Sequence, residues 1–150
     1  MRKHHLIFIC FFLITSVFLH AQTAQAIEDL LDSPAVNMQE AAWLVLEAAN
    51  ISGIAGPAEA FQYAADQRWL TNVAANDSIR LDRLSFLIMQ AFNIRGGIFY
   101  GIIGGPHYAY RELVNRGIIM GRIDPAMAVS GEDLLFIVNR VLAFQEANIL

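Results

Sequence analysis

The clearest structural signal in this chain is the segment Ser130-Gly-Glu-Asp-Leu-Leu-Phe-Ile-Val-Asn-Arg-Val-Leu-Ala-Phe-Gln-Glu-Ala147. Its apolar residues recur at the intervals expected for one face of a helix, and they are Leu134, Leu135, Ile137, Val138, Val141 and Leu142. The same periodicity predicts helices that open near Asp82 and near Asn37. No segment shows the sustained alternation typical of a strand, so the chain is predicted to be all-α.

Two further helices are predicted between these segments. One runs from about Pro57 to Trp69, with a proline at a tolerated first-turn position. The other runs from Pro106 to about Arg116, and Gly117 is expected to end it as a C-terminal glycine. The sequence therefore predicts about five helices.

The predicted helices belong to repeats. When the chain is shifted by 48 residues, Asp82 falls on Ser130 and Phe86 on Leu134. A shift of 45 residues places Asn37 on Asp82. The pattern predicts two and a half copies of a helix–loop–helix unit, with the half copy at the N-terminal end. Because one unit cannot bury its apolar face alone, the copies are expected to share a core as one compact bundle.

Polar residues mark where three of the helices begin. Asn37, Asp82 and Ser130 each precede a helical apolar pattern, as N-cap residues do. Glu40 and Asp133 follow Asn37 and Ser130 by three residues, which predicts a capping-box pair in each case.

The first 26 residues are typical of a secretory signal peptide. Arg2 and Lys3 precede an apolar run over residues 6–19, and Ala24-Gln-Ala26 fits the small-x-small cleavage pattern. The run is shorter than the about 20 residues that a membrane-spanning helix needs. We therefore expect residues 1–26 to be removed on export. Residues 27–150 are expected to form one domain in the periplasm, on the envelope surface or in a secreted form.

Removal of residues 1–26 would also limit the chemistry open to the chain. The one Cys and three of the four His lie there, which leaves His107 alone, and the loss of Arg2 and Lys3 moves the formal charge from −4 to −6. We therefore expect no metal site, no cofactor and no thiol chemistry. An acidic chain without a basic stripe is not typical of a nucleic-acid binder, and no later apolar run reaches transmembrane length.

These exclusions favour a protein that is not an enzyme. No nucleophile elbow, phosphate loop or calcium loop is present in the sequence. A small hydrolase that uses two carboxylates stays open as an alternative, and Glu132 and Asp133 are adjacent acids. At a helix N-terminus such acids are ordinarily there for the helix dipole.

Three segments of the chain are similar to one known family. They are Tyr108-Ala-Tyr-Arg-Glu-Leu-Val-Asn-Arg-Gly-Ile-Ile-Met-Gly121, Asp124-Pro125 and Val129-Ser-Gly-Glu-Asp-Leu-Leu135. Together they resemble an S-layer homology repeat, which has an aromatic-Ala opening, a Gly-Ile-x-x-Gly turn, an Asp or Pro loop and an Ile-Thr-Arg-Ala-Glu helix start. Leu81-Asp-Arg-Leu-Ser-Phe86 and Val36-Asn-Met-Gln-Glu-Ala41 resemble the same helix start. The resemblance covers most of residues 36–144.

The resemblance to S-layer homology repeats implies a short helical bundle that binds anionic, often pyruvylated, cell-wall polysaccharide. It implies a ligand-binding Arg at Arg83, with Arg80 and Asp82 beside it. An arginine and the free N–H groups of a helix N-terminus together form a modest anion site. Trp69 and Tyr108 are candidates to stack on a sugar ring. The alternative is a protein–protein interaction module that has kept the fold and lost the polysaccharide site.

The glycine-rich segment over residues 96–105 is predicted to be a connection between two copies. Its large apolar residues are Ile98, Phe99, Ile102 and Ile103. We expect them to be buried and to bridge the copies across the core. If they are exposed instead, they form an apolar patch that a partner could contact.

Overall fold

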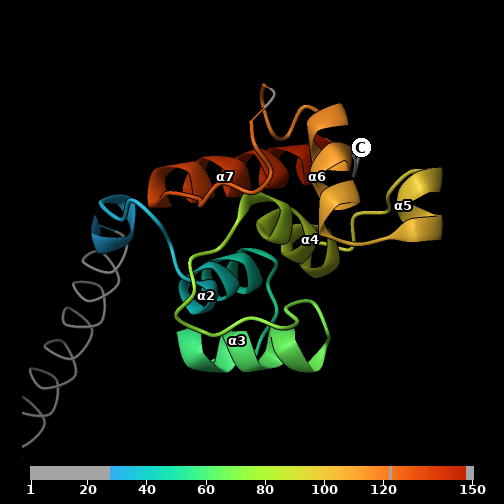
Figure 1. The fold of residues 1–150 in the computed structure, drawn as a ribbon. Helices are drawn as coiled ribbons and strands as arrows, with labels where there is room; N and C mark the ends of the chain where they lie inside the picture. The colour runs from blue at the N-terminus through green and yellow to red at the C-terminus, as the bar shows by residue number, and fades with distance from the viewer. Residues whose placement is uncertain (1–27, 122, 148–150) are drawn as a thin grey trace, which may run out of the picture.

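The computed structural model describes residues 28–121 and 123–147, so the predicted signal peptide lies outside the described residues. The described chain is helical, as predicted (Figure 1). Its helices are α2 (Met38–Ala48), α3 (Pro57–Asp66), α4 (Leu81–Ala91), α5 (Ile98–Ile103), α6 (Pro106–Asn115) and α7 (Gly131–Ala147). None of the helices in these ranges combines the length and hydropathy that a membrane crossing requires.

Two helices differ from the sequence prediction. α3 ends at Asp66 rather than at Trp69, because the backbone turns at Arg68, where φ is +62°. α5 falls in the glycine-rich segment that was predicted to be a connection. Several glycines in a short apolar run hide a helix, since glycine lowers helix propensity by about 1 kcal/mol relative to alanine.

The repeats pack in a different phase from the one predicted. α2 packs mainly against α3 and α4 against α6, while α2 also contacts α4 and α7, and α5 packs on α6. The half copy is therefore α7, at the C-terminal end, and not the helix that begins after Asn37. The apolar faces of these helices form one continuous core, as the repeat pattern predicts.

Three buried residues tie the copies together at the centre of the fold. Ile79 N–H donates to the carbonyl of Val36 (2.8 Å), Val129 N–H to that of Ile79 (3.0 Å), and Val36 N–H to that of Val129 (2.9 Å). Each residue lies two positions before a helix starts or immediately before its N-cap, and each is at most 2% exposed. This closed ring of hydrogen bonds relates α2, α4 and α7 by an approximate threefold arrangement.

The ring sets the true register of the copies. Val36, Ile79 and Val129 are equivalent, so the copies are offset by 43 and 50 residues rather than by 45 and 48. The N-cap of α4 is consequently Arg80, and Asp82 lies inside the first turn. The prediction of Asp82 as an N-cap is wrong because Ile79 and Leu81 are both apolar, and an apolar pattern alone cannot decide which of them precedes the cap.

The caps predicted at the other two helix starts are present. Glu40 N–H donates to Asn37 Oδ1 (2.9 Å) and the Glu40 carboxylate accepts from Asn37 N–H, which completes a capping box. Asp133 N–H donates to Ser130 Oγ (3.1 Å), and the Ser130 hydroxyl donates to Asp133 Oδ2 (2.7 Å). Both helix starts are therefore fixed by local hydrogen bonds.

Four helices end in the same way. After α2, α3, α4 and α6 one residue adopts a positive φ, and these residues are Asn50, Arg68, Asn93 and Gly117. In each case the next residue donates its N–H back to the carbonyl two residues before the end of the helix or its C-cap turn, as Ile118 does to Leu113 (2.9 Å). This is the Schellman arrangement, which satisfies carbonyl groups that a helix end leaves free.

Arg68 occupies the position that glycine occupies in the second copy. A residue with a Cβ atom is strained in the left-handed region, whereas glycine is not. We expect Arg68→Gly to raise the free energy of unfolding by about 0.5–1 kcal/mol, and urea denaturation followed by circular dichroism measures the change. Gly117→Ala is the matched control and should lower stability by about 1 kcal/mol. Equal effects of the same sign would contradict the equivalence of the two turns.

Candidate functional site

The threefold arrangement creates three equivalent grooves, each between the start of one helix and the segment that precedes it. The first groove lies at α2, the second at α4 and the third at α7. In this register the third helical residues are Glu40, Arg83 and Asp133, and an aromatic residue follows each of them at Trp43, Phe86 and Phe136. Since these side chains differ, the three grooves present different chemistry on one scaffold.

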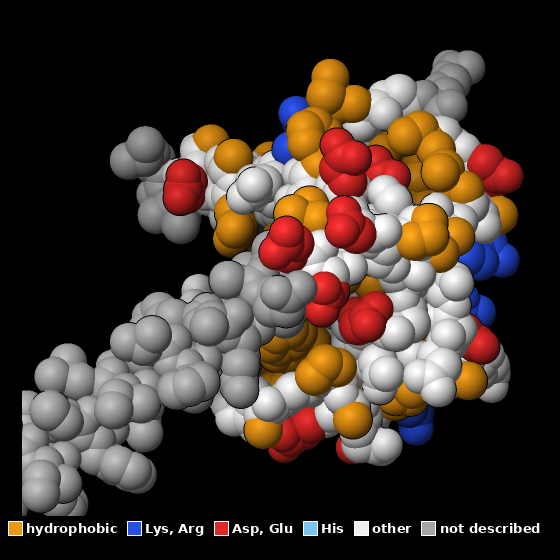
Figure 2. Space-filling model, turned by 90° about the vertical axis from the view of Figure 1, so that its left-hand side faces the viewer, with side chains coloured by type: hydrophobic (Ala, Val, Ile, Leu, Met, Phe, Trp, Pro, Cys, Tyr) orange, Lys and Arg blue, Asp and Glu red, His pale blue; other side chains and the backbone are white. Residues whose placement is uncertain are grey.

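The helix starts also give one face of the molecule its charge. α2, α4 and α7 begin on the same side, and Figure 2 shows acidic side chains gathered in the middle of that face, beside apolar ones. Acids in the first turn of a helix are stabilised by the helix dipole. Glu40, Asp82, Glu132 and Asp133 all lie in first turns.

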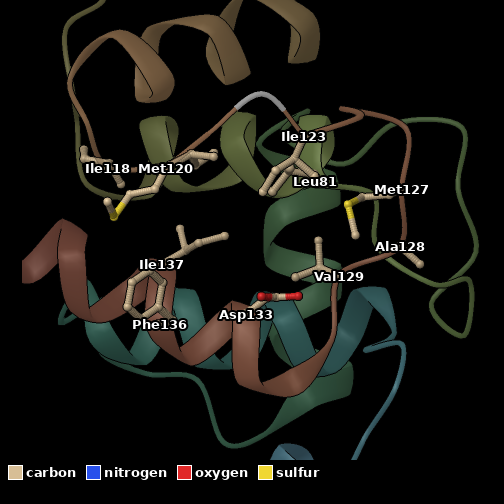
Figure 3. A pocket seen from close by; sticks show the side chains of 11 residues that line it. Leu81, Ile118, Met120, Ile123, Met127, Ala128, Val129, Asp133, Phe136 and Ile137 are labelled. Atoms are coloured by element: carbon tan, nitrogen blue, oxygen red, sulfur yellow. The ribbon is translucent and has the colours of Figure 1, made fainter.

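The third groove forms an apolar pocket of about 240 Å³ between α7 and the loop that precedes it (Figure 3). Leu81, Ile119 and Val129 form part of its wall, and each is almost fully buried. Phe136 and Ile137 project into it from α7, while Ile123 and Met127 project from the loop. Of the residues that line this pocket, Asp133 alone is charged.

The rim of the third groove holds unusually exposed apolar side chains. Met120 is 60% exposed and Phe136 is 52% exposed, while Ile123 and Met127 are each 40% exposed. Among the described residues, the other large apolar side chains with comparable exposure are Leu31 and Ile103, which do not line this pocket. Exposed apolar side chains that gather in one place mark a contact surface, whereas scattered ones do not.

Arg140 fixes one wall of the third groove. Its Nε donates to the carbonyl of Ile118 (2.9 Å), and its Nη2 donates to the carbonyl of Gly117. The guanidinium also lies over the ring of Phe136, 5.7 Å from the ring centre. These contacts hold α7 and the loop at a set distance, so the pocket is formed before anything binds.

The first groove is a second pocket, of about 290 Å³, and it is acidic. It is lined by Asp29, Leu30, Ser33, Glu40, Trp43 and Pro57. Trp43 is half-buried and takes the place that Phe136 takes in the third groove. The Glu40 carboxylate already serves the capping box at Asn37, so its charge is partly committed to the helix start.

The second groove contains the predicted polysaccharide site, and the structure brings Arg80, Asp82 and Arg83 together there. Arg80 Nη2 donates to Asp82 Oδ2 at 2.7 Å, and Asp82 Oδ1 accepts from the Arg83 N–H at 2.8 Å. Arg83 Nη1 reaches across the groove to the carbonyl of Thr71 at 3.0 Å. Both arginines therefore have partners within the chain, and Arg83 spans the groove from one side to the other.

The register from the ring assigns the family's arginine position differently from the sequence comparison. With Val36, Ile79 and Val129 at the Ile of the motif, the Arg position falls on Met38, Leu81 and Gly131. Met38 and Leu81 are buried in the core. The assignment of Arg83 to this position is therefore wrong, and Arg83 instead takes the position of the motif's Glu.

Gly131 shows why the third copy has no side chain at that position. A Cβ atom there would lie 1.6 Å from the carbonyl oxygen of Leu30. The Gly131 N–H also donates to the carbonyl of Ser33 at 2.9 Å. The turn at the start of the described chain thus covers the beginning of α7 and occupies the space where an arginine would project.

Neither predicted aromatic residue lies in a groove described above. Trp69 packs against the core, with its ring edge-on to Tyr63 at 5.7 Å. Tyr108 is half-buried, and its ring lies edge-on to His107 at 5.7 Å. The groove aromatics are Trp43 and Phe136, which the sequence analysis did not single out. Their common place after the N-cap is visible only once the register of the copies is correct.

The glycine-rich segment is not wholly buried as expected, because Ile103 is 59% exposed. The side chains of Ile98, Phe99 and Ile102 lie outside the described residues. Tyr100, in the same helix, accepts a hydrogen bond at its hydroxyl from Gln90 Nε2 (2.8 Å), and its partial burial raises the pKa of the phenol. This bond attaches α5 to α4.

Within residues 28–121 and 123–147, no three His, Cys, Asp or Glu side chains come together in the way that a metal site requires. Comparison with known proteins adds no assignment: no family model, curated protein or solved structure matches the chain. The chemistry of the grooves is therefore the basis for a functional proposal.

Proposed function

We propose that this protein is an exported, non-enzymatic binding or scaffolding protein of the cell envelope, and that it holds another envelope protein in the third groove. The observation behind the proposal is the pocket of about 240 Å³ with four exposed apolar side chains on its rim. A preformed apolar pocket lowers the cost of binding, because few groups must be ordered when the partner arrives. The export itself rests on the signal-peptide pattern of residues 1–26.

The alternative ligand is an anionic wall polysaccharide bound at the second groove. The observation in its favour is that Arg80 and Arg83 lie together at the start of α4, where the side chain of Arg80 is 47% exposed. Against it, Asp82 pairs with Arg80, and Arg83 is bound to the carbonyl of Thr71. A polymer would have to displace these contacts, so the protein partner is the better-supported proposal.

One co-sedimentation experiment separates the two ligands. The purified protein is mixed either with detergent-solubilised envelope proteins on a tagged support or with protein-free wall polymer. We expect recovery with the protein fraction, and Phe136→Ala should reduce it by about tenfold or more, as for a central aromatic contact. Ile103→Ala removes an equally exposed apolar side chain outside the groove, and it should leave recovery unchanged.

The polymer arm decides the alternative. Binding to protein-free polymer that disappears in Arg83→Ala and survives in Phe136→Ala would establish the polysaccharide proposal in place of the protein partner. Recovery of envelope protein that is insensitive to Phe136→Ala would reject the third groove as the binding surface.

A further inference from the structure

The third groove has an apolar floor and a rim of flexible side chains. Its wall residues Leu81, Ile119 and Val129 are buried, whereas Met120 and Met127 stand exposed at its edge. Methionine side chains are unbranched and polarisable, so they adapt to apolar groups of different shape. The groove is therefore suited to several apolar side chains presented in a row.

Negative charge lies at one end of the same groove. Asp133 lines the pocket, Glu132 is exposed next to it, and Asp124 is exposed on the loop that forms the opposite wall. Asp133 accepts one hydrogen bond from Ser130 through Oδ2, which leaves its other oxygen for a second donor. The basic group nearest to the groove, Arg140, is directed at the carbonyls of Gly117 and Ile118.

We infer that the third groove binds a segment of a partner protein in which a row of apolar side chains ends in lysine or arginine. The inference rests on the proposed function and adds the chemistry of the partner. The apolar side chains would fill the pocket beside Phe136, and the basic group would reach the Asp133 end. Charge at the edge of an apolar contact selects partners and orients them more than it adds affinity.

The charge also argues against two other occupants. A second copy of this chain would bring the same acidic groove end and a formal charge of −6, after loss of residues 1–26, against its own kind. Like charges placed opposite each other in an interface are costly. An anionic lipid surface would meet the same carboxylates, so a basic protein segment is the occupant that fits.

The test uses two labelled amphipathic peptides as probes. Both have leucines along one helical face, and they differ only in bearing lysines or glutamates at one end. Fluorescence anisotropy with the purified protein at low salt should give binding of the lysine peptide at least about tenfold tighter than that of the glutamate peptide. Phe136→Ala should weaken the lysine peptide by about tenfold, and Ile103→Ala should not change it.

Asp133→Asn tests the charged end separately from the apolar floor. Asparagine can still accept from Ser130, so the helix start is kept, and a thermal melt by circular dichroism verifies the fold. The preference for lysine over glutamate should fall to within about threefold, the range of an exposed ion pair. Glu132→Gln removes an exposed charge that does not line the pocket, and it should change the preference less than Asp133→Asn.

Four results would overturn this inference. They are equal binding of both peptides, binding of neither, a concentration-dependent dimer that Phe136→Ala abolishes, and tighter binding to anionic lipid vesicles than to the lysine peptide. Loss of the peptide result together with a Phe136-dependent recovery of envelope protein would reject the basic partner and keep the proposed function. Loss of both would reject the groove altogether.

Discussion

Replacement of Ser85 by glutamate is expected to lower the free energy of unfolding by about 4 kcal/mol, because it buries an uncompensated charge. Ser85 is fully buried, and its hydroxyl donates to the carbonyl of Leu81 at 2.7 Å within α4. A carboxylate there would either lose its hydration or force the helix away from the core. Since a domain of this size has a stability of about 5–15 kcal/mol, much of the protein should unfold at lower urea concentration.

The matched control is Arg83→Glu. By sequence alone Ser85 stands at the Glu of the repeat motif, whereas the hydrogen-bonded ring assigns that place to Arg83, level with Glu40 and Asp133. Arg83→Glu loses the bond to Thr71 but places an acid in a first turn, where the helix dipole favours it. The net change should stay within about 1 kcal/mol. A tolerated Ser85→Glu beside a damaging Arg83→Glu would contradict the register found in the structure.

Gly131→Ala is expected to destabilise the protein by about 2 kcal/mol, the usual cost of forcing an extra methyl group into a packed site. The new Cβ atom would overlap the carbonyl oxygen of Leu30 at 1.6 Å, and a backbone atom cannot move aside as a flexible side chain can. The turn over residues 28–33 would have to leave the start of α7. Urea denaturation measures the loss, and faster hydrogen exchange over residues 28–33 would identify its source.

A second helical glycine provides the control for this substitution. Gly101 lies within α5, and a Cβ atom there would meet nothing within 4 Å. Gly101→Ala should therefore raise stability by about 0.5–1 kcal/mol, because alanine is the better helix former. If Gly131→Ala proves as harmless as Gly101→Ala, the N-terminal turn does not pack on α7 as described.

The three grooves show how one repeated scaffold can acquire unequal surfaces. At the second groove Arg83 bridges to the carbonyl of Thr71, and at the first Trp43 stands beside Glu40 and Asp29. In the third, an apolar pocket remains open with Phe136 at its rim. The backbone ring that relates the copies does not depend on these side chains, so each groove could change without loss of the fold.

The sequence by itself determined the local features of this protein. Helical periodicity predicted α2, α4, α6 and α7, and it predicted most of α3, because residues three and four apart share a helix face whatever they pack against. The pairs of Asn37 with Glu40 and of Ser130 with Asp133 were also predictable, since a capping interaction spans only three residues.

Only the tertiary structure decided the register of the copies and hence the site. A choice between Ile79 and Leu81 as the residue before the cap involves two apolar side chains of similar propensity, and the deciding hydrogen bonds come from Val36 and Val129. Those partners lie about 40 to 50 residues away along the chain, so no local pattern contains them. Because the register assigns the groove residues, Phe136 and the pocket beside it could be found only after the chain had folded.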